Sequence, residues 1–395
     1  MVRSSIYLNE VGVVCALGAS ASSVRVGLFA DQPGGVAANS AIVAGKELFL
    51  GAVTQALHSV DGLPHPLRSR NNALLLTALQ QIRGAVDAAI SRYGAHRVAV
   101  VVGTSTAGIG EAQAAMAHYA AHQALPPVFH FSQQEMGSPV MALNAELGLC
   151  GPVVGVSTAC SSSAKALASA ARLLNAGMAD AVIAGGMDAL SHFTVAGFAS
   201  LEALSTTRCN PLSRNRCGIN IGEGGALFLM TREPGDVRLA GWGESSDAYH
   251  ISAPSPKGTG ALAAMRAALE RAKIAPGAID YINLHGTATR QNDTVECLAV
   301  HEVFSSTTPV SSTKPLTGHT LGGAGALEAA LCWLTLRDNP KGLLPPHWWD
   351  GEVDPELAPL NIVRSADPLG RAPKYVLSNS FAFGGSNASL VLAQG

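Results

Sequence analysis

The chain has 395 residues, of which 48% are hydrophobic and only 14% are charged, and this is enough for one large α/β unit or two domains. A formal net charge of −2 gives no basic field for nucleic acid, and no uncharged apolar run is long enough to cross a bilayer. The seven cysteines contain no CxxC pair, which argues against a disulfide scaffold or a zinc cluster and predicts a reducing, cytoplasmic location.

Strand-like runs alternate with alanine-rich helical patterns along the whole chain. Before the turn at 232–236 we expect strands at 6–15, 97–103, 153–157, 181–185 and 225–231, and helices at 72–93 and 161–176. After it we expect strands at 238–243, 281–284, 310–311, 375–380 and 389–393, and helices at 260–273, 293–304 and 321–336. This alternation predicts an α/β fold with buried sheets, divided into residues 1–235 and 236–395.

A cysteine lies at one of the predicted strand-to-helix junctions. The apolar run 152–157 leads through Thr158 and Ala159 to Cys160, and a helical pattern begins at Ser161. Free N–H groups at a helix N-terminus favour a thiolate and can hold a developing oxyanion. A lone cysteine is more commonly structural, so this junction predicts a nucleophile only in combination with other residues.

Two later strand-like runs end close to a histidine. His285 follows the run 281–284, and His319 follows the run 310–311 with Lys314 between them. Each histidine alone is more commonly structural than catalytic. A thiol combined with two imidazoles is suited to acyl transfer, in which a thioester forms and a carbonyl or enolate oxygen must be stabilised.

These residues stand in motifs that resemble those of the β-ketoacyl-acyl carrier protein synthases of the thiolase superfamily. The motifs occur in the family's order and cover most of the chain: Thr158–Ser163, His285–Thr289, Ser312–Lys314 with Gly318–His319, and Asn379–Asn387. The resemblance implies a thiolase-like fold of two similarly folded halves in αβαβα layers. It also implies an active site where the halves meet.

The resemblance assigns catalytic roles to five residues. Cys160 would take the acyl chain as a thioester, and His285 and His319 would promote malonyl decarboxylation and stabilise the enolate. Lys314 would tune the second of these histidines, and Glu328 would pair with that lysine. No cofactor and no metal are implied.

The same resemblance assigns residues that contact the substrate. Phe383 would gate entry of the acyl chain, and its backbone N–H would form the oxyanion hole together with that of the nucleophile. Thr287 and Thr289 would hold the phosphopantetheine arm. Thr106 and Ala107 would line the acyl pocket close to a dimer partner.

Four arginines are candidates for docking an acidic carrier protein, because complementary charge steers association. They are Arg68 and Arg70 near the start of a predicted helix, and Arg214 and Arg216 in a central loop. Ordinary solvated arginines explain each of them equally well.

The implied activity is decarboxylative Claisen condensation of an acyl group on Cys160 with malonyl-carrier protein, by a homodimer. Ser161 stands where housekeeping elongation enzymes carry alanine, so fatty acid, polyketide and aryl polyene pathways all stay open. One alternative is a chain-length partner subunit in a heterodimer, but such subunits typically lack the nucleophile. Another is a thiolase, which would need a second cysteine near the C-terminus, whereas none follows Cys332.

Overall fold

The computed structural model describes residues 5–43, 47–364 and 368–395. Before the turn at 232–236, which we call the first half, the strands are β1 (Tyr7–Val14), β2 (Ala37–Asn39), β3 (Leu48–Leu50), β4 (Val98–Gly103), β5 (Val153–Val156), β6 (Ala181–Asp188) and β7 (Gly224–Thr231). The helices of the first half are α1 (Ala21–Leu28), α2 (Arg70–Tyr93), α3 (Ile109–His122), α4 (Ser138–Leu147), α5 (Ser162–Asn175) and α6 (His192–Ser200).

The part after the turn, which we call the second half, repeats this alternation. Its strands are β8 (Val237–Ser246), β9 (Tyr281–Asn283), β10 (Pro309–Ser311), β11 (Asn361–Ile362), β12 (Tyr375–Ala382) and β13 (Ser386–Gln394). Its helices are α7 (Thr259–Ala272), α8 (Arg290–Phe304), α9 (Lys314–Thr317) and α10 (Ala324–Leu336). All ten predicted strands are present, and several extend beyond their predicted ends.

The two halves share one strand order. The first half runs β5-β4-β6-β7-β1 and the second β10-β9-β12-β13-β8, so both read 3-2-4-5-1 when the five strands of each run are numbered in chain order. In each half the second strand is parallel to its two neighbours, and the remaining pairs are antiparallel. The halves meet where Tyr7 of β1 pairs with Arg238 of β8.

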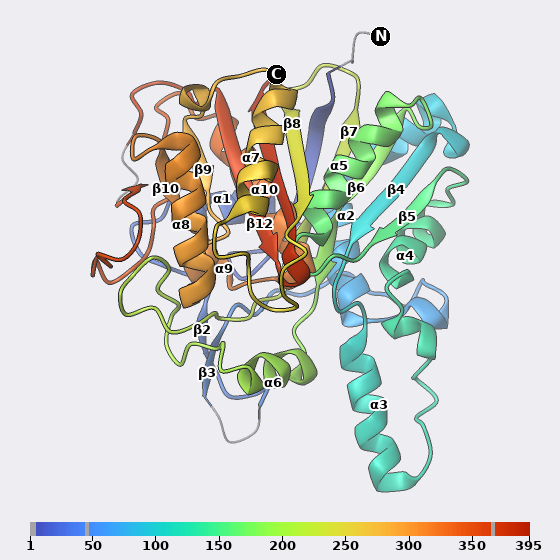
Figure 1. Cartoon of the computed structure of the whole chain (residues 1–395). Coiled ribbons are helices and arrows are strands. Elements are labelled where there is room, and N and C mark those ends of the chain that lie inside the picture. Colours follow the sequence, from blue (N-terminus) through green and yellow to red (C-terminus); the bar gives the residue numbers. More distant parts are fainter. Residues whose placement is uncertain (1–4, 44–46, 365–367) are drawn as a thin grey trace.

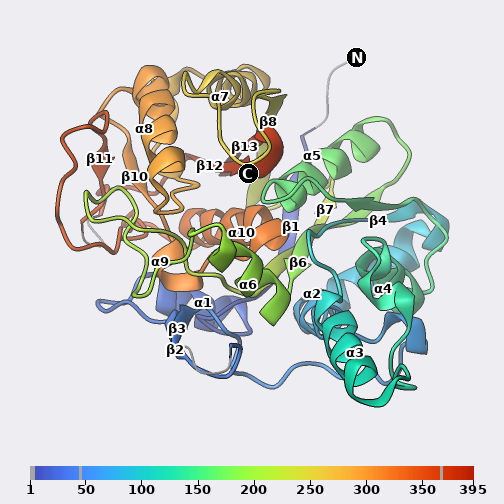
Figure 2. The same ribbon diagram turned by 60° about the horizontal axis from the view of Figure 1, so that its bottom comes forward.

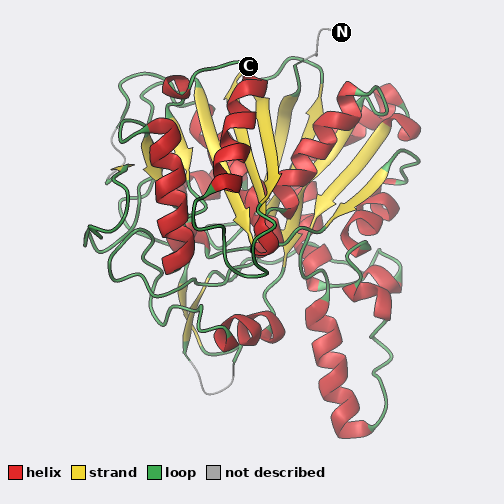
Figure 3. Cartoon of the chain, viewed as in Figure 1, coloured by secondary structure: helices red, strands yellow, loops and turns green. Residues whose placement is uncertain are grey.

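Helices cover the sheet on both faces and also fill its interior (Figures 1 and 3). Helices α5 and α10 contact each other between the two halves of the sheet, and Figure 2 shows α10 near the middle of the molecule. Their side chains build a buried core with the inward faces of the strands. Helices α2 and α4 pack outside the first half and α7 outside the second, with α8 against α7. The expected αβαβα layering is therefore present.

The sequence analysis did not predict α1, α3, α4, α6 or the short α9, and α3 shows one reason. Helix α3 extends away from the sheet in Figure 1, and its Met116 and Tyr119 are 54% and 45% exposed. Such a helix lacks the buried stripe from which helical periodicity is recognised. Among the helices within the described ranges, none is long and apolar enough to span a membrane.

Candidate active site

The strand-to-helix junction after β5 places Cys160 in a tight turn. The chain passes through Ala159 in a left-handed conformation, with φ of 51°, and α5 begins at Ser162. The Ser162 hydroxyl accepts the backbone N–H of Thr158 at 2.8 Å and so closes the turn. The thiol is thereby presented at the start of the helix, although Cys160 is only 7% exposed.

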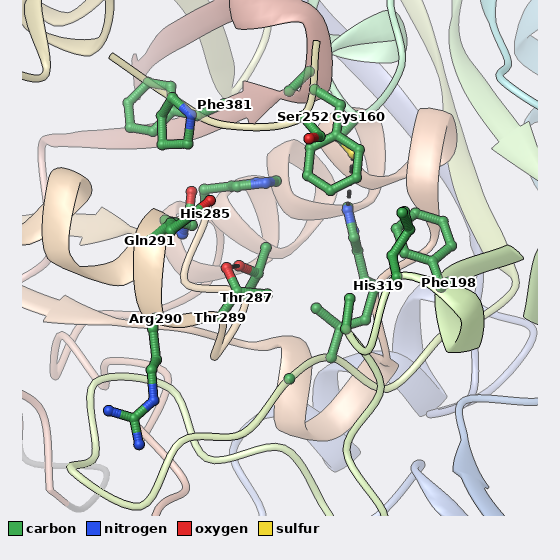
Figure 4. A pocket seen from close by; sticks show the side chains of 18 of the residues that line it. Cys160, Phe198, Ser252, His285, Thr287, Thr289, Arg290, Gln291, His319 and Phe381 are labelled. Carbon is green, nitrogen blue, oxygen red and sulfur yellow. Dashed lines mark hydrogen bonds between the residues drawn. The ribbon is translucent and has the colours of Figure 1, made fainter. Parts of the chain in front are cut away.

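Both candidate histidines converge on this thiol from the second half. His319 Nε2 lies 3.0 Å from Cys160 Sγ. The rings of His285 and His319 are nearly perpendicular, at 84°, with their centroids 5.3 Å apart. Figure 4 shows both rings facing the same cavity, with His319 directed at the sulfur. The structure thus brings two histidines of the second half to a thiol of the first half that lies more than 120 residues earlier in the sequence.

Burial sets the charge of all three groups. It lowers the pKa of His285 and of His319 well below the ordinary value of 6.5, and the nearby Lys314 charge lowers both further. Burial also raises the pKa of the Cys160 thiol to about 11, which the Lys314 charge and the backbone N–H of Phe383 only partly oppose. The expectation of a stabilised thiolate is therefore not met at rest, because burial outweighs the charges and N–H groups nearby.

Lys314 and Glu328 form a buried ion pair next to the histidines, with side chains that are 2% and 3% exposed. The lysine Nζ also lies 3.5 Å from His285 Nδ1, within hydrogen-bond distance of the first histidine, while its charge contributes to the lowered pKa of the second, His319. Since an ammonium only donates, His285 Nδ1 must accept and the ring proton resides on Nε2. His285 is thus set as a hydrogen-bond donor.

Two cavities meet at the thiol. The larger has a volume of about 610 Å³ and is lined by Cys160, both histidines, Thr287, Thr289 and Phe383. The smaller, of about 370 Å³, is lined by Cys160, Thr106, Ile109, Phe193, Phe198 and Phe383. A substrate could therefore reach the sulfur through one cavity and extend an apolar chain into the other.

Comparison with known proteins shows the family to which this chain belongs. Residues 38–234 match the family "Beta-ketoacyl synthase, N-terminal domain", and residues 237–348 match "Beta-ketoacyl synthase, C-terminal domain". The chain belongs to the β-ketoacyl synthase family. The two family matches meet at the same turn that separates the halves of the sheet.

Individual known proteins resemble the chain along different lengths. A ketosynthase (ApeO) in complex with its chain length factor (ApeC) from Xenorhabdus doucetiae is 44% identical, with a TM-score of 0.94 over 99% of this chain and 98% of that one. Nodulation protein E of Rhizobium meliloti is 32% identical over 89% of both chains. The 3-oxoacyl-[acyl-carrier-protein] synthase 2 of Staphylococcus aureus is 36% identical over 63% of this chain, which spans 65% of that relative.

The remaining substrate residues expected of a β-ketoacyl synthase lie in different places. The hydroxyls of Thr287 and Thr289 are 3.0 Å apart in the larger cavity. Thr106 lines the smaller cavity, but its hydroxyl donates to Asp188 at 2.9 Å. Ala107 is buried, with φ of 44°, and lines neither cavity.

Phe383 lies between the two cavities, as a gating residue would. Its side chain is 40% exposed and stacks on Phe198, with centroids 5.9 Å apart and an interplanar angle of 29°. Phe198 was missed by the sequence analysis, because α6 carries no motif of the family. An apolar pair of this kind can swing without breaking a hydrogen bond.

The four candidate docking arginines do not form one patch. Arg216 is only 4% exposed and pairs with Asp354, so its expected role at the surface is not supported by its placement. The Arg70 guanidinium is committed to the buried carboxylate of Glu223. The other three arginines are at least partly exposed, with Arg70 at 44%. Arg68 bonds carbonyls of its own loop, and Arg214 is 61% exposed beside Glu352.

Two buried carboxylates that the sequence analysis did not assign hold the site loops. Glu296 accepts the backbone N–H groups of His285 and Gly286 at 2.8 and 2.7 Å, and burial raises its pKa to about 7. Asp188 accepts hydrogen bonds from the loop 104–106 and from the backbone N–H of Gly322. Asp188 ends the run Gly185-Gly186-Met187-Asp188, and this glycine-rich run is the sequence feature that could have pointed to it.

The Cys160, His285 and His319 ligand atoms lie within 4.8 Å of one another, which is close enough for one metal ion among the described residues. The Lys314 ammonium beside His285 opposes a cation there, because it places positive charge next to a ligand. The donor set suits proton transfer and hydrogen bonding instead.

Proposed function

We propose that the protein is a β-ketoacyl-acyl carrier protein synthase that condenses an acyl group held on Cys160 with a malonyl thioester. The observation that carries this proposal is a buried thiol in contact with one of two neutral imidazoles. A protonated thiol needs a base to attack a thioester, and an enolate needs neutral hydrogen-bond donors. This site supplies both without a cofactor.

In the loading step, Cys160 Sγ attacks the acyl thioester of the carrier protein. His319 Nε2 accepts the thiol proton and passes it to the departing carrier thiol. The tetrahedral oxyanion is held by the backbone N–H groups of Cys160 and Phe383. The acyl group is then bound to Cys160 and the carrier leaves as a free thiol.

In the condensation step, the malonyl thioester loses carbon dioxide and becomes an enolate. His285 Nε2–H and His319 Nε2–H donate to its oxygen, and its carbon attacks the acyl thioester. The Cys160 thiolate leaves and takes up one proton, and the product is a β-ketoacyl-carrier protein. His319 Nδ1 has no hydrogen-bond partner among the described residues, so neither tautomer is fixed and the ring can accept in one step and donate in the next.

The partner would be an acyl carrier protein that inserts its phosphopantetheine arm through the larger cavity, past Thr287 and Thr289. Arg68, Arg70 and Arg214 are the arginines that we retain for docking, since Arg216 is buried. Free cysteines at seven positions agree with a reducing, cytoplasmic setting.

The subunit arrangement is proposed from an uncovered apolar face. Edge strand β5 exposes Val154, and nearby Met136 and Phe131 are 40% and 63% exposed. Such a face favours a second subunit. We favour a homodimer. A heterodimer is the second candidate, because the similar Xenorhabdus doucetiae ketosynthase is in complex with a chain length factor. A non-catalytic role for this chain is disfavoured, since Cys160, His285 and His319 are all present.

We also propose that residues 1–235 and 236–395 are duplicated halves, and the repeated strand order supports this.

Dimer type is tested by co-expression and native mass spectrometry. Function is tested by intact-protein mass spectrometry after incubation with a panel of acyl-carrier thioesters. A Cys160-dependent adduct, followed by β-ketoacyl product on adding malonyl-carrier protein, is expected. The absence of any adduct with every chain, alone and with a partner subunit, would overturn the proposal.

A further inference from the structure

We propose that Lys165 is a positioning residue. Through the hydroxyls of Ser386 and Ser161, it keeps the two backbone N–H groups of the oxyanion hole at their working separation. This inference rests on the proposed function. It concerns the relative position of two backbone N–H groups, one from Cys160 in the first half and one from Phe383 in the second.

A short hydrogen-bonded chain joins the two segments that carry these N–H groups. Lys165 Nζ donates to Ser386 Oγ at 2.6 Å, and Ser386 Oγ lies 3.1 Å from Ser161 Oγ. Ser161 directly follows the nucleophile, and Ser386 lies three residues after Phe383. The chain therefore crosses the seam between the halves next to the thiol.

The Ser386 hydroxyl is the point at which this chain converges. Ser161 Oγ donates to Ser386 Oγ at 3.1 Å, and Lys165 Nζ donates to the same oxygen at 2.6 Å. Ser386 Oγ therefore accepts from two residues of the first half, one in the nucleophile turn and one on α5. Ser161 Oγ also lies 2.8 Å from the Thr158 carbonyl, so its hydroxyl is held within the nucleophile turn.

Lys165 lies on the helix face from which its ammonium reaches Ser386. It lies one helical turn after Ser161 on α5, and therefore on the same face. Among the ion pairs found in the described parts of the chain, none involves Lys165, although its side chain is half-buried and burial lowers its pKa. The bond to Ser386 is what satisfies the ammonium on its buried side.

The loop that Lys165 holds is also anchored to the second half. Gly384 and Gly385 both have positive φ, at 78° and 72°, which glycine adopts without strain. The Gly384 N–H donates to the Ile251 carbonyl at 2.7 Å, and the Gly385 carbonyl accepts the Asp247 N–H at 2.8 Å. The bond that Ser161 donates to Ser386 ties the same loop to the nucleophile turn of the first half.

The test separates the two half-reactions. Acyl loading uses the oxyanion hole, whereas malonyl decarboxylation depends on the histidines. Lys165→Met should slow loading about tenfold, less than the hundredfold or more that follows loss of an oxyanion donor. Decarboxylation should stay within about twofold of wild type. Lys165→Arg, which keeps a donor, should recover most of the loading rate, and Ser386→Ala should reproduce the loss.

Arg172→Met is the matched control, because Arg172 lies on the same helix but pairs with Glu244. It should load at the wild-type rate. Equal loading by wild type, Lys165→Met and Ser386→Ala would overturn the inference, as would an equal fall in both half-reactions. If wild type itself loads no acyl chain, the proposed function fails, and this result is distinct from the failure of the Lys165 inference.

Discussion

The two halves share a strand order, yet the segments that follow their third strands are built differently. After β5 the chain turns within five residues into α5, and the thiol lies in that turn. After β10 it takes a longer path, in which α9 begins at Lys314 and His319 follows the helix, before α10 begins at Ala324. The repeated fold thus brings the segment after β5 close to the segment after β10. The first carries the proposed nucleophile, and the second carries groups that we propose to transfer protons.

Burial acts on the thiol and on the two histidines in opposite directions. It raises the pKa of the acid, Cys160, and lowers the pKa of the bases, His285 and His319. All three groups are therefore neutral near pH 7. The common cause is the cost of placing charge in a dry pocket, and the one charge that is kept, on Lys314, is compensated by Glu328.

The largest effect should come from the first-half strand end. Cys160→Ala removes the thiol that we propose to form the thioester, so acyl-enzyme formation should fall about a thousandfold or more. Intact-protein mass spectrometry measures this. Cys150→Ala, which changes an exposed cysteine, should load normally. A labelled acyl group trapped by Cys160→Ala would contradict the assignment of the nucleophile to the first half.

The charge on the second-half strand end should matter chiefly for stability. Lys314→Met leaves the Glu328 carboxylate buried without its partner, which should cost about 3–5 kcal/mol in the free energy of unfolding. Urea unfolding checks this. The double variant Lys314→Met with Glu328→Leu should regain most of the stability but not the condensing activity. A double variant as unstable as the single one would show that the ion pair is not the cause.

The two histidines should differ because only His319 contacts the thiol. His285→Ala should reduce malonyl decarboxylation about a hundredfold or more while changing acyl loading much less. His319→Ala should impair both steps. Stopped-flow loading and carbon dioxide release separate them. If His285→Ala slowed loading as strongly as His319→Ala does, the two rings would not have the separate roles that the geometry gives them.

A smaller effect is expected from His347, whose ring is hydrogen-bonded to the segment that follows β10. Its Nδ1 accepts the backbone N–H of Ser312 at 3.0 Å, its Nε2–H donates to the Pro211 carbonyl at 2.9 Å, and burial lowers its pKa to about 4. The unfolded chain therefore binds the proton first, so this stability is full above pH 6.5 and is lost as pH falls toward 4.

Between pH 6.5 and pH 5 the wild type should lose about 2 kcal/mol more than His347→Gln, measured by urea unfolding at each pH. His301→Gln serves as the control, because His301 lies at the surface on α8. Parallel pH profiles for wild type and His347→Gln would assign the acid sensitivity to other groups.

Sequence patterns predicted the elements better than the environments of their residues. The β-branched runs and the motifs around Cys160, His285 and His319 identified the strand ends and the reacting groups. Arg216 looked like a docking residue because a charged side chain in a loop is usually solvated. Only the packing of the loop against Asp354 shows that it is buried. Helix α3 was missed because its apolar face is directed at solvent.

The sequence by itself determined which residue types could carry the chemistry and in what order the strands and helices follow, because propensity and periodicity are local properties. The tertiary structure decided that Lys314 contacts His285, that Cys160 rests as a thiol and that the chain from Lys165 crosses the seam. Each of these depends on distance and on exclusion of water between segments far apart along the chain, and no local pattern records either.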